Sequence, residues 1–246
     1  MALQTFKRYE DKFLLDRRQY EALLNRLGRF MDLDSHCHGG TYKICNIYFD
    51  TVNNDIIRHS ISKPYYKEKL RLRSYGTPEN DNSKVFLELK KKIGGVVNKR
   101  RVITTYGEAK KYLETGEKPA DADELSLQVF REIDWFLQNN PVRPAAYISY
   151  DRVAMFAKDN PEFRLTFDSN VETRRSDLFL GAGSYGQQLL EPDTFIMEIK
   201  IEDALPMNVA RILSEEGAYS RSFSKFGTEF RHYLLSKKTE KEKIAI

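Results

Sequence analysis

The sequence predicts an α+β fold in which antiparallel strands form a sheet and amphipathic helices pack against it. Many short segments alternate charged with apolar residues, which is the two-residue period of a half-buried strand. A few longer segments place apolar residues three and four apart, which is the period of an amphipathic helix. The 246 residues include 15 Phe and 14 Tyr, which is enough core material for one large domain.

The first part of the chain should form two strands with a helix between them. Residues 6–15 predict a strand, and Asp16 is expected to cap a helix that ends near Gly28. Residues 44–49 predict a short strand rich in β-forming residues, followed by a brief helix or turn. The apolar face of the helix would consist of Tyr20, Leu23, Leu24 and Leu27.

Three strands should follow in close succession, over residues 66–75, 84–93 and 96–105. Gly94 and Gly95 separate the last two strands, and glycine tolerates the positive φ that a two-residue hairpin turn requires. We therefore expect the three strands to be antiparallel neighbours.

The second half of the chain should begin with a helical region and return to strands. Residues 106–139 are expected to be mostly helical, and strands should cover 145–156, 162–171 and 194–201. One helix should start near Pro206 and a final helix should cover 228–236. We expect a single domain over residues 1–236, followed by a charged, frayed tail over 237–246.

The net charge of +4 is unevenly distributed along the chain. Residues 63–101 hold 12 Lys and Arg against 4 Asp and Glu, so this segment carries +8 and the rest of the chain −4. A basic block in an otherwise acidic protein indicates a local anionic partner. The alternative is a solvated basic face without a ligand.

Alternation along the strands places the charged residues of each strand on one face. One example is the segment 66–75, in which Lys67, Lys69, Arg71 and Arg73 share a face while Leu70 and Leu72 lie behind it. The same pattern recurs in the other predicted strands. The charged and polar residues on these faces are Arg8, Glu10, Lys12, Glu88, Lys90, Lys92, Lys99, Arg101, Tyr150, Arg152, Arg164, Thr166, Asp168, Glu198, Lys200 and Glu202.

Two arrangements of the sheet are compatible with this alternation. An open sheet would have helices on one face and water on the other. A closed barrel would turn the charged faces inward, where so many cations require water and a polyanion. A triphosphate fits such a lining, because Arg and Lys bind phosphate and a few carboxylates bind the accompanying Mg²⁺ or Mn²⁺.

Nine motifs occur in an order that resembles a known family. They are RYEDKF, YFDT, KLRLRSYG, FLELKKK, NKRR, YDRVAMF, RLTFD, MEIK and FSKFG, and they extend from about residue 5 to residue 235. This set is similar to the VTC-type polyphosphate polymerase domain of the triphosphate tunnel metalloenzyme (CYTH-like) superfamily. The resemblance implies an eight-stranded antiparallel β-barrel tunnel with helices outside it. It also implies transfer of the γ-phosphate of ATP onto a growing polyphosphate chain, with Mn²⁺ or Mg²⁺ as cofactor.

The resemblance also implies roles for individual residues. Those expected to hold the reacting phosphates are Arg71, Arg73, Lys90, Arg152, Arg164 and Lys225. Those expected to bind other parts of the substrate are Arg8, Lys12, Lys99, Tyr150 and Ser224, together with Lys69, Arg101 and Lys200, which alternation along the strands places on the same faces. Metal ligands are expected among Glu198, Glu10 and Glu88, with Glu198 as the main one.

One departure from the superfamily pattern concerns the first strand. The wider superfamily has ExExK there, whereas this chain has Arg8-x-Glu10-x-Lys12. An arginine in place of a glutamate exchanges a metal ligand for a phosphate contact. This favours the polymerase branch over the hydrolytic and cyclase branches.

Three functional classes remain open at this point. The first is the polymerase, with ATP and inorganic polyphosphate as its partners. The second is a metal-dependent tripolyphosphatase or nucleoside triphosphatase that uses water as acceptor. The third is a non-catalytic polyphosphate-binding module. RNA is disfavoured because Glu and Leu, not aromatic residues, separate the cations in KEKLRLRSYG.

Composition gives an expectation about location. Only two cysteines occur, Cys37 and Cys45, which favours reduced thiols in the cytoplasm. No apolar run approaches the ~20 residues of a membrane span, and no signal peptide is recognisable. Any attachment to a membrane would then come from a partner protein.

Overall fold

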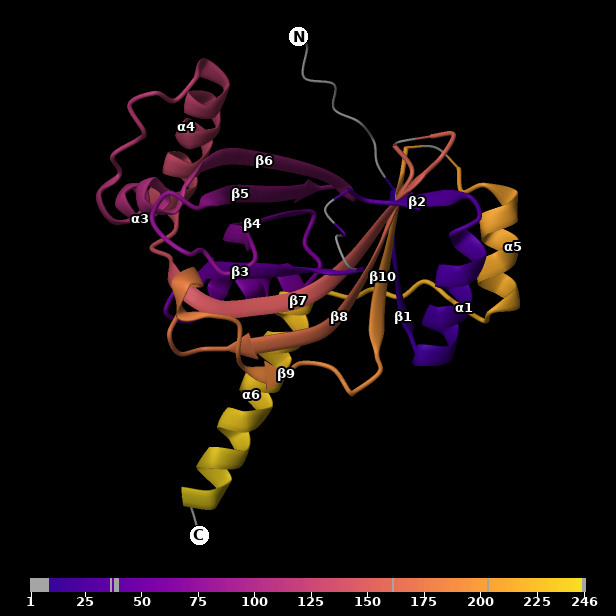
Figure 1. Ribbon diagram of the computed structural model, residues 1–246. Helices are drawn as coiled ribbons and strands as arrows, with labels where there is room; N and C mark the ends of the chain where they lie inside the picture. Colours follow the sequence, from indigo (N-terminus) through magenta and orange to yellow (C-terminus); the bar gives the residue numbers. More distant parts are fainter. Residues whose placement is uncertain (1–8, 36, 38–39, 161, 203, 245–246) are drawn as a thin grey trace. The chain divides into compact units, whose positions relative to one another are not determined.

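The computed structural model describes residues 9–244 except 36, 38–39, 161 and 203 (Figure 1). The main strands are β1 (Tyr9–Leu15), β3 (Tyr42–Asp50), β4 (Tyr66–Tyr75), β5 (Lys84–Ile93), β6 (Val96–Thr105), β7 (Arg143–Ala157), β8 (Arg164–Arg174) and β10 (Phe195–Ile201), with two shorter strands, β2 (Met31–Leu33) and β9 (Gln187–Gln188). The helices are α1 (Arg17–Leu27), α2 (Asp55–Ile61), α3 (Tyr106–Thr115), α4 (Glu124–Asn139), α5 (Met207–Glu215) and α6 (Lys225–Ile244), with a 3₁₀ turn, η1 (Leu180–Ala182).

The strands form one hydrogen-bonded sheet in the order β1-β10-β8-β7-β3-β4-β5-β6. Consecutive members β1 and β10, β10 and β8, β4 and β5, and β5 and β6 are antiparallel. The short strand β2 pairs with β7, and β9 pairs with β8. The predicted α+β class, with eight main strands and amphipathic helices, is confirmed.

The chain divides into two compact units that share three continuous strands. Unit 1 comprises Met1–Ile44, Tyr150–Val171 and Leu190–Phe223, and unit 2 comprises Cys45–Ser149, Glu172–Leu189 and Ser224–Ile246. The boundaries fall inside β3, β7 and β8. Each unit has its own hydrophobic core.

In unit 1, helices α1 and α5 lie side by side (Figure 1) and pack their apolar faces into the core of that unit. Helix α1 begins with a capping box, because the Asp16 side chain accepts the backbone N–H of Gln19 and the Gln19 side chain accepts the N–H of Asp16. Its residues Leu23 and Leu27 are fully buried. They meet inward-facing residues of β1, β8 and β10, including Phe13, Leu165, Phe167, Met197 and Ile199.

In unit 2, α3 and α4 cover one face of the β4–β5–β6 sheet (Figure 1). Helix α4 contributes Phe130, Ile133 and Phe136 to the core, all at most 1% exposed. Because these residues are three apart, they occupy one stripe of the helix, as an amphipathic helix requires. The other face of these strands is left for polar side chains.

Several predicted elements match the structure and others differ. The three strands expected over 66–75, 84–93 and 96–105 have those bounds, and Gly94 and Gly95 have φ values of 53° and 92°. The helical region 106–139 is two helices, because Gly116 ends α3 with a left-handed φ of 78°. Helix α6 starts earlier than predicted and continues beyond Ser236 to Ile244, because Lys and Glu in that segment favour helix.

Candidate functional site

One face of the β4–β5–β6 sheet in unit 2 carries a block of charged side chains. The register places Lys67 opposite Lys92 and Lys69 opposite Lys90, and Lys90 in turn lies opposite Lys99. Like charges directly opposite one another destabilise a sheet, so the arrangement favours an anionic ligand. We call this block the basic face, and it consists of Lys67, Lys69, Arg71, Glu88, Lys90, Lys92, Lys99 and Arg101.

The apolar residues of the same strands determine the direction of these charges. Leu70 and Leu72 of β4 and Leu87 and Leu89 of β5 are buried in the core with α3 and α4. Because successive side chains on a strand point to opposite faces, the residues between them must point away from that core. The basic face is therefore a consequence of the alternation in the sequence.

Glu88 is the carboxylate of the basic face, and its side chain is 1% exposed. Its Oε2 accepts a 2.5 Å hydrogen bond from Arg71 Nε and lies 3.9 Å from Arg73 Nε. Its Oε1 lies 3.6 Å from Lys99 Nζ. One buried carboxylate of β5 thus interacts with three cations on β4 and β6, the two strands that flank β5.

These contacts change the protonation of both acid and base. Burial by itself would raise the pKa of Glu88, but the attraction of Arg71, followed by that of Arg73 and Lys99, outweighs burial and holds this pKa well below its usual value. Burial of the ammonium is the largest effect on Lys99. Together with the nearby arginines it lowers the pKa of Lys99 to about 8 despite Glu88, although the side chain as a whole is 44% exposed.

Polar residues of β3 orient the two arginines of β4. Arg73 Nε donates a 2.9 Å hydrogen bond to Asn46 Oδ1, and Asn46 Nδ2 donates to the backbone oxygen of Ile148. Arg71 Nη1 donates a 3.3 Å hydrogen bond to the Tyr48 hydroxyl. The guanidinium groups are therefore held in fixed orientations, as recognition of phosphate by Arg requires.

The start of helix α6 belongs to the same part of unit 2. The Phe226 ring stacks on Tyr48 at 4.7 Å between centroids, and Lys69 Nζ lies 5.9 Å from the Phe226 centroid. Ser224 caps the helix, because its Oγ accepts the N–H of Gly227 at 3.2 Å. Lys225 is the first residue of α6.

A second group of charged residues lies in unit 1, on strands β1, β8 and β10. Here opposite charges face each other, because Glu10 is the partner of Lys200 and Lys12 is the partner of Glu198. Lys12 Nζ lies 3.1 Å from Glu10 Oε1 and 3.3 Å from Glu198 Oε1. Lys200 Nζ lies 3.3 Å from Glu198 Oε2, and Arg164 is the register partner of Lys200 on β8. We call Glu10, Lys12, Glu198 and Lys200 the mixed-charge cluster.

Arg152 of unit 1 forms a salt bridge with a buried carboxylate. Its Nε and Nη2 donate hydrogen bonds of 2.6 Å and 2.7 Å to the two oxygens of Asp168, which is fully buried. Burial opposes the charge of Arg152, but Asp168 raises its pKa well above the usual value. The Tyr150 ring lies 5.2 Å from the guanidinium carbon. This bidentate pair fixes the Arg152 plane.

The mixed-charge cluster has the donor atoms of a site for a hard divalent cation. Glu10 and Glu198 supply carboxylate oxygens, and Thr166, the register partner of Glu198, has a buried Oγ1 with no hydrogen-bond partner in the described part of the chain. Oxygen donors of this kind suit Mg²⁺ and Mn²⁺, which commonly bind one or two carboxylates together with substrate phosphates. Among the described residues no group of three or more His, Cys, Asp or Glu could hold a metal, so substrate oxygens would have to complete the coordination.

The predicted site residues therefore fall into two groups, one in each unit. The basic face, Arg73 next to it on β4 and the start of α6 account for one group, which is Arg71, Arg73, Lys90, Lys69, Lys99, Arg101, Glu88, Ser224 and Lys225. The strands of unit 1 account for Glu10, Lys12, Tyr150, Arg152, Arg164, Glu198 and Lys200. Arg8 lies outside the described residues.

Sequence reasoning did not identify the neutral residues that orient the charges. Asn46 and Tyr48 alternate with the buried residues Cys45, Ile47 and Phe49 of β3. That alternation is the same signal that identified the charged faces, so it could have indicated Asn46 and Tyr48 as well. The stacking of Phe226 on Tyr48 joins segments far apart in the sequence, and no local pattern reports it.

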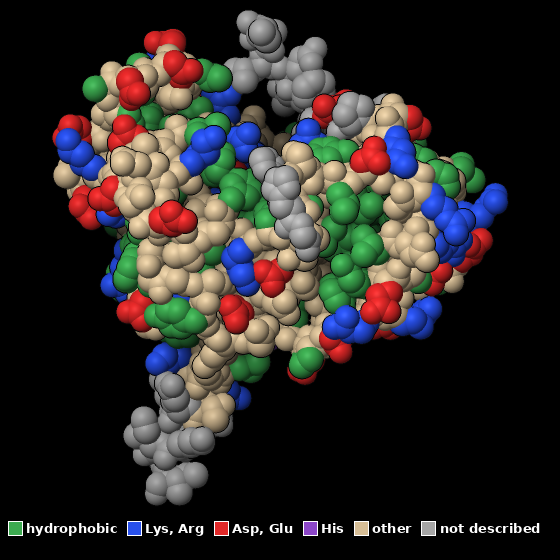
Figure 2. Space-filling view, viewed as in Figure 1, with side chains coloured by type: hydrophobic (Ala, Val, Ile, Leu, Met, Phe, Trp, Pro, Cys, Tyr) green, Lys and Arg blue, Asp and Glu red, His purple; other side chains and the backbone are tan. Residues whose placement is uncertain are grey.

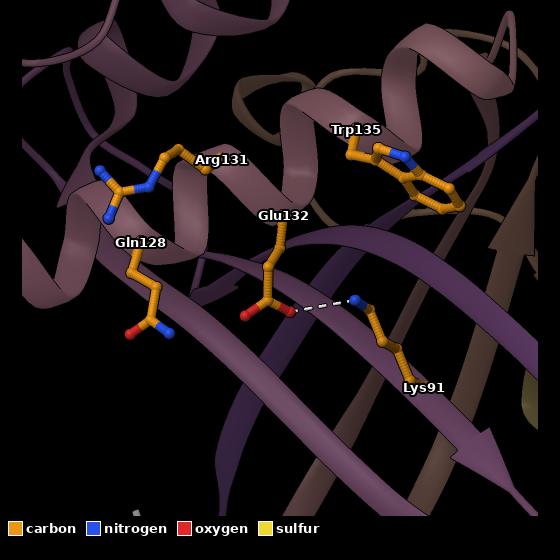
Figure 3. Close-up of a pocket in the computed structure, with 5 residues that line it drawn as sticks. All are labelled: Lys91, Gln128, Arg131, Glu132 and Trp135. Atoms are coloured by element: carbon orange, nitrogen blue, oxygen red, sulfur yellow. Dashed lines mark hydrogen bonds and ion pairs between the residues drawn. The ribbon is translucent and has the colours of Figure 1, made fainter.

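A surface pocket of about 320 Å³ lies elsewhere on unit 2, between α4 and β5 (Figure 3). It is lined by Lys91, Gln128, Arg131, Glu132 and Trp135, and Lys91 Nζ pairs with Glu132 at 3.0 Å. Because Lys91 alternates with Lys90 and Lys92, it points to the opposite side of β5 from the basic face. Acidic and basic side chains are mixed over the α3 and α4 region (Figure 2), as on an ordinary solvated surface.

A family model and several solved structures, two of which are described below, match this chain. The model of the VTC domain matches residues 7–233. A candidate adenylate cyclase from Bacillus halodurans is 14% identical with a TM-score of 0.54, and the match covers 89% of this chain and 95% of that one. HpAC1 from Hippeastrum, a candidate adenylyl cyclase described as revealing a dominant triphosphatase activity, is 19% identical with a TM-score of 0.51, and the match covers 88% and 92%. These likenesses establish a shared fold. No curated protein sequence matches the chain, and within the described residues no helix is long and apolar enough to cross a membrane.

Proposed function

The chain belongs to the VTC domain family, and from this premise we propose that it is a metal-dependent phosphotransferase that extends polyphosphate with the γ-phosphate of ATP. Its substrates are ATP and inorganic polyphosphate, and its cofactor is Mn²⁺ or Mg²⁺. The alternative that shares the same chemistry is hydrolysis of a triphosphate.

The observation that carries the polymerase proposal is the extent of the basic face. Residues paired across β4, β5 and β6 form rows, and three successive rows begin at Arg71, Lys69 and Lys67 of β4. Residues of one face are two apart, so the three rows extend over about 14 Å of strand. Seven Lys and Arg accompany a single Glu in these rows. A polyanion longer than one triphosphate can contact all seven cations, whereas the triphosphate substrate of a triphosphatase would contact only some of them.

Within the basic face, we assign phosphate contacts to the cations and a positioning role to Glu88. The Glu88 carboxylate is surrounded by Arg71, Arg73 and Lys99, so it serves as their common counter-ion and keeps their donor groups in place. This environment favours an anchoring role over the metal-binding role that the sequence suggested. Glu198 and Glu10 are the metal ligands in this proposal, and Thr166 provides a third oxygen.

The reaction requires positioning and charge neutralisation more than acid–base catalysis. A terminal phosphate oxygen of the acceptor chain attacks the γ-phosphorus, the new P–O bond lengthens the chain by one phosphate, and the bond to the β-phosphate oxygen breaks to release ADP. The acceptor oxygen is already anionic, so no general base is needed. Fixed Arg and Lys side chains stabilise the charge on the transferred group. A bound divalent metal supplies further charge neutralisation on the phosphate oxygens.

The test is to incubate the pure protein with ATP and Mn²⁺ and to separate the products on a urea gel. Long-chain polyphosphate together with ADP supports the proposal. Orthophosphate and ADP without polymer would contradict it and support hydrolysis. Binding of polyphosphate without turnover of ATP would identify a non-catalytic binding module.

Variants on the two faces of β5 provide a matched comparison. Lys90→Met removes a cation of the basic face, and the proposal expects polymer formation to fall by about 10²–10³-fold, the usual effect of removing one electrostatic contact to a transition state. Lys91→Met removes a cation from the next position, which points to the opposite side of the strand. We expect near-normal activity for Lys91→Met, and equal losses in both variants would contradict the assignment.

Hydrolysis is the second candidate, and the likeness to HpAC1 favours it. Because water replaces the acceptor chain in that reaction, the row of the basic face that contains Lys67 and Lys92 would be unnecessary. Lys67→Met combined with Lys92→Met separates the two readings. In a polymerase the double variant should shorten the product chains, whereas in a triphosphatase it should leave the rate of phosphate release unchanged.

A further inference from the structure

Lys12 lies in the position where a metal bound by Glu10 and Glu198 would be expected. Its Nζ is 3.1 Å from Glu10 Oε1 and 3.3 Å from Glu198 Oε1, and these oxygens come from two different strands. All three side chains are largely buried, with 22%, 20% and 10% exposure for Lys12, Glu10 and Glu198. One ammonium therefore contacts two carboxylates, which point toward it from different strands.

A divalent cation cannot use both oxygens while the ammonium stays there. Oxygen ligands lie roughly 2.0–2.6 Å from Mg²⁺ or Ca²⁺, which is shorter than either distance to Lys12 Nζ and leaves no room for a second cation between the carboxylates. Lys12 must move away from Glu10 and Glu198 before the metal takes their oxygens. The displaced ammonium then needs another anion, because an unpaired charge is costly in a largely buried place.

The charge of the mixed-charge cluster leads to the same conclusion. The cluster contains two glutamates and two lysines, so its net charge is zero. The second lysine, Lys200, pairs with Glu198 at 3.3 Å. Adding a divalent cation alone would leave an excess of two positive charges. Adding the cation together with a polyphosphate offsets this excess and gives the displaced lysine phosphate oxygens to bind.

We propose that Lys12 is a built-in substitute for the metal, which holds Glu10 and Glu198 together in the metal-free protein and makes retention of the metal depend on a bound polyphosphate. The metal then enters the cluster with the substrate and leaves when the substrate leaves. This inference rests on the metal ligands assigned above. It adds that one residue couples the two binding events.

The experiment measures binding of Mn²⁺ alone to the full chain, without nucleotide, from the electron paramagnetic resonance signal of free Mn²⁺. The wild-type protein should bind Mn²⁺ weakly. Lys12→Met removes the ammonium but keeps a side chain of similar length, and it should bind Mn²⁺ about ten-fold more tightly, the equivalent of roughly 1.4 kcal/mol. Adding Glu198→Gln to Lys12→Met should abolish the gain and so locate the site.

Three further variants separate this effect from a change in net charge or folding. Lys43→Met removes another cation of unit 1, one that pairs with Asp151 at 2.8 Å, and it should leave Mn²⁺ binding as in the wild type. Lys12→Arg keeps the charge and should not tighten binding, and Lys12→Gln offers a second neutral side chain if the Met variant folds poorly. Unchanged or weaker binding in the neutral variants, or equal tightening by Lys43→Met, would overturn the inference.

The outcome does not depend on which reaction the protein performs. Binding of Mn²⁺ alone is measured without turnover, so tight binding by Lys12→Met would stand even if the product proved to be orthophosphate. If polymer forms but the neutral variants do not gain affinity, then the coupling fails while the polymerase proposal remains.

Discussion

At the scale of single residues, Glu88 determines whether the cations of the basic face can remain close together. Its side chain is 1% exposed and lies near Arg71, Arg73 and Lys99. Removing its charge leaves three cations without their common counter-ion. Loss of one partner of a buried ion pair typically costs about 3–5 kcal/mol, so we expect Glu88→Gln to lower the free energy of unfolding at pH 7 by roughly 3 kcal/mol in urea denaturation. Tripolyphosphate should restore part of this loss by replacing the anion.

The effect of Glu88 should depend on pH in a defined direction. Its pKa in the folded protein is held far below the ordinary value of 4.5, so the stabilisation is fully present above that value. As the pH falls below about 4.5, the unfolded chain takes up a proton that the folded protein does not, and the stability of the wild type declines. The difference between wild type and Glu88→Gln should therefore shrink below that pH. A difference that grows instead would contradict this role.

Lys99 gives a second prediction about pH at the residue scale. Burial and neighbouring cations lower its pKa to about 8, whereas a bound polyanion would favour the charged form and raise that pKa. Binding of tripolyphosphate at pH 8.5 should therefore take up a fraction of a proton. Calorimetric titrations in buffers of different ionisation enthalpy measure this uptake. Lys99→Arg, which stays charged at this pH, should bind without it, and equal uptake in both proteins would exclude Lys99 as the source.

The lowered pKa of Lys99 also makes stability depend on pH, in the direction opposite to its effect on phosphate binding. The pKa of Lys99 in the folded protein is below that in the unfolded chain, so between about 8 and 10.5 the unfolded chain holds the proton that the folded protein has lost. The contribution of Lys99 to stability therefore rises with pH across this window. The contribution of Lys99 to phosphate binding falls across the same pH window, because Lys99 loses its positive charge in the ligand-free protein.

At the scale of elements, helix α6 is attached to unit 2 by an aromatic contact beside the basic face and by an ion pair with Arg175, which directly follows β8. Phe226 is 1% exposed and stacks on Tyr48, which in turn accepts a hydrogen bond from Arg71. Farther along the helix, Arg175 donates hydrogen bonds of 2.6 Å and 2.9 Å to the two oxygens of Glu229. These contacts fix where Lys225 begins the helix.

Phe226→Ala should therefore affect binding as well as stability. Removing a buried phenylalanine side chain costs about 3–5 kcal/mol, and the loss of contact with Tyr48 should weaken tripolyphosphate binding measured by calorimetry at a temperature where the variant is folded. Leu235→Ala on the same helix, at a residue that is 64% exposed, should change neither quantity. Normal affinity in folded Phe226→Ala would show that α6 does not support the basic face.

The elements were predictable from sequence wherever alternation and turn residues agreed. The strands that flank Gly94 and Gly95 have the predicted bounds because both are rich in β-forming residues, apolar and charged residues alternate from Leu87 to Lys90, and the glycines supply the turn. Helix boundaries were less predictable, since the Lys- and Glu-rich segment after Ser236 has no apolar face but still favours helix. At the site, the charged residues were predictable by period, whereas the pairing of Lys12 with both Glu10 and Glu198 depends on the register of β1 and β10, which no local pattern specifies.

At the scale of the whole molecule, the two units should unfold together. Independent domains are usually separated by exposed linkers, but here the unit boundaries fall inside strands β3, β7 and β8. Opening one unit would therefore break strands that also belong to the core of the other. We therefore expect residues 1–236 to unfold as a single domain.

Each unit contains one buried cysteine, and the pair allows a direct test of this cooperativity. Cys37 in unit 1 is 8% exposed and Cys45 in unit 2 is fully buried. We expect brief thiol labelling across a urea gradient, read by mass spectrometry of the two peptides, to give the same midpoint for both cysteines, and the fluorescence of Trp135 in unit 2 to follow that midpoint. Heat denaturation should likewise give one calorimetric transition whose enthalpy equals the van't Hoff enthalpy. Labelling of Cys37 at a clearly lower urea concentration than Cys45, or the reverse, would mean that the shared strands do not couple the units, and residues 1–236 would then behave as two domains.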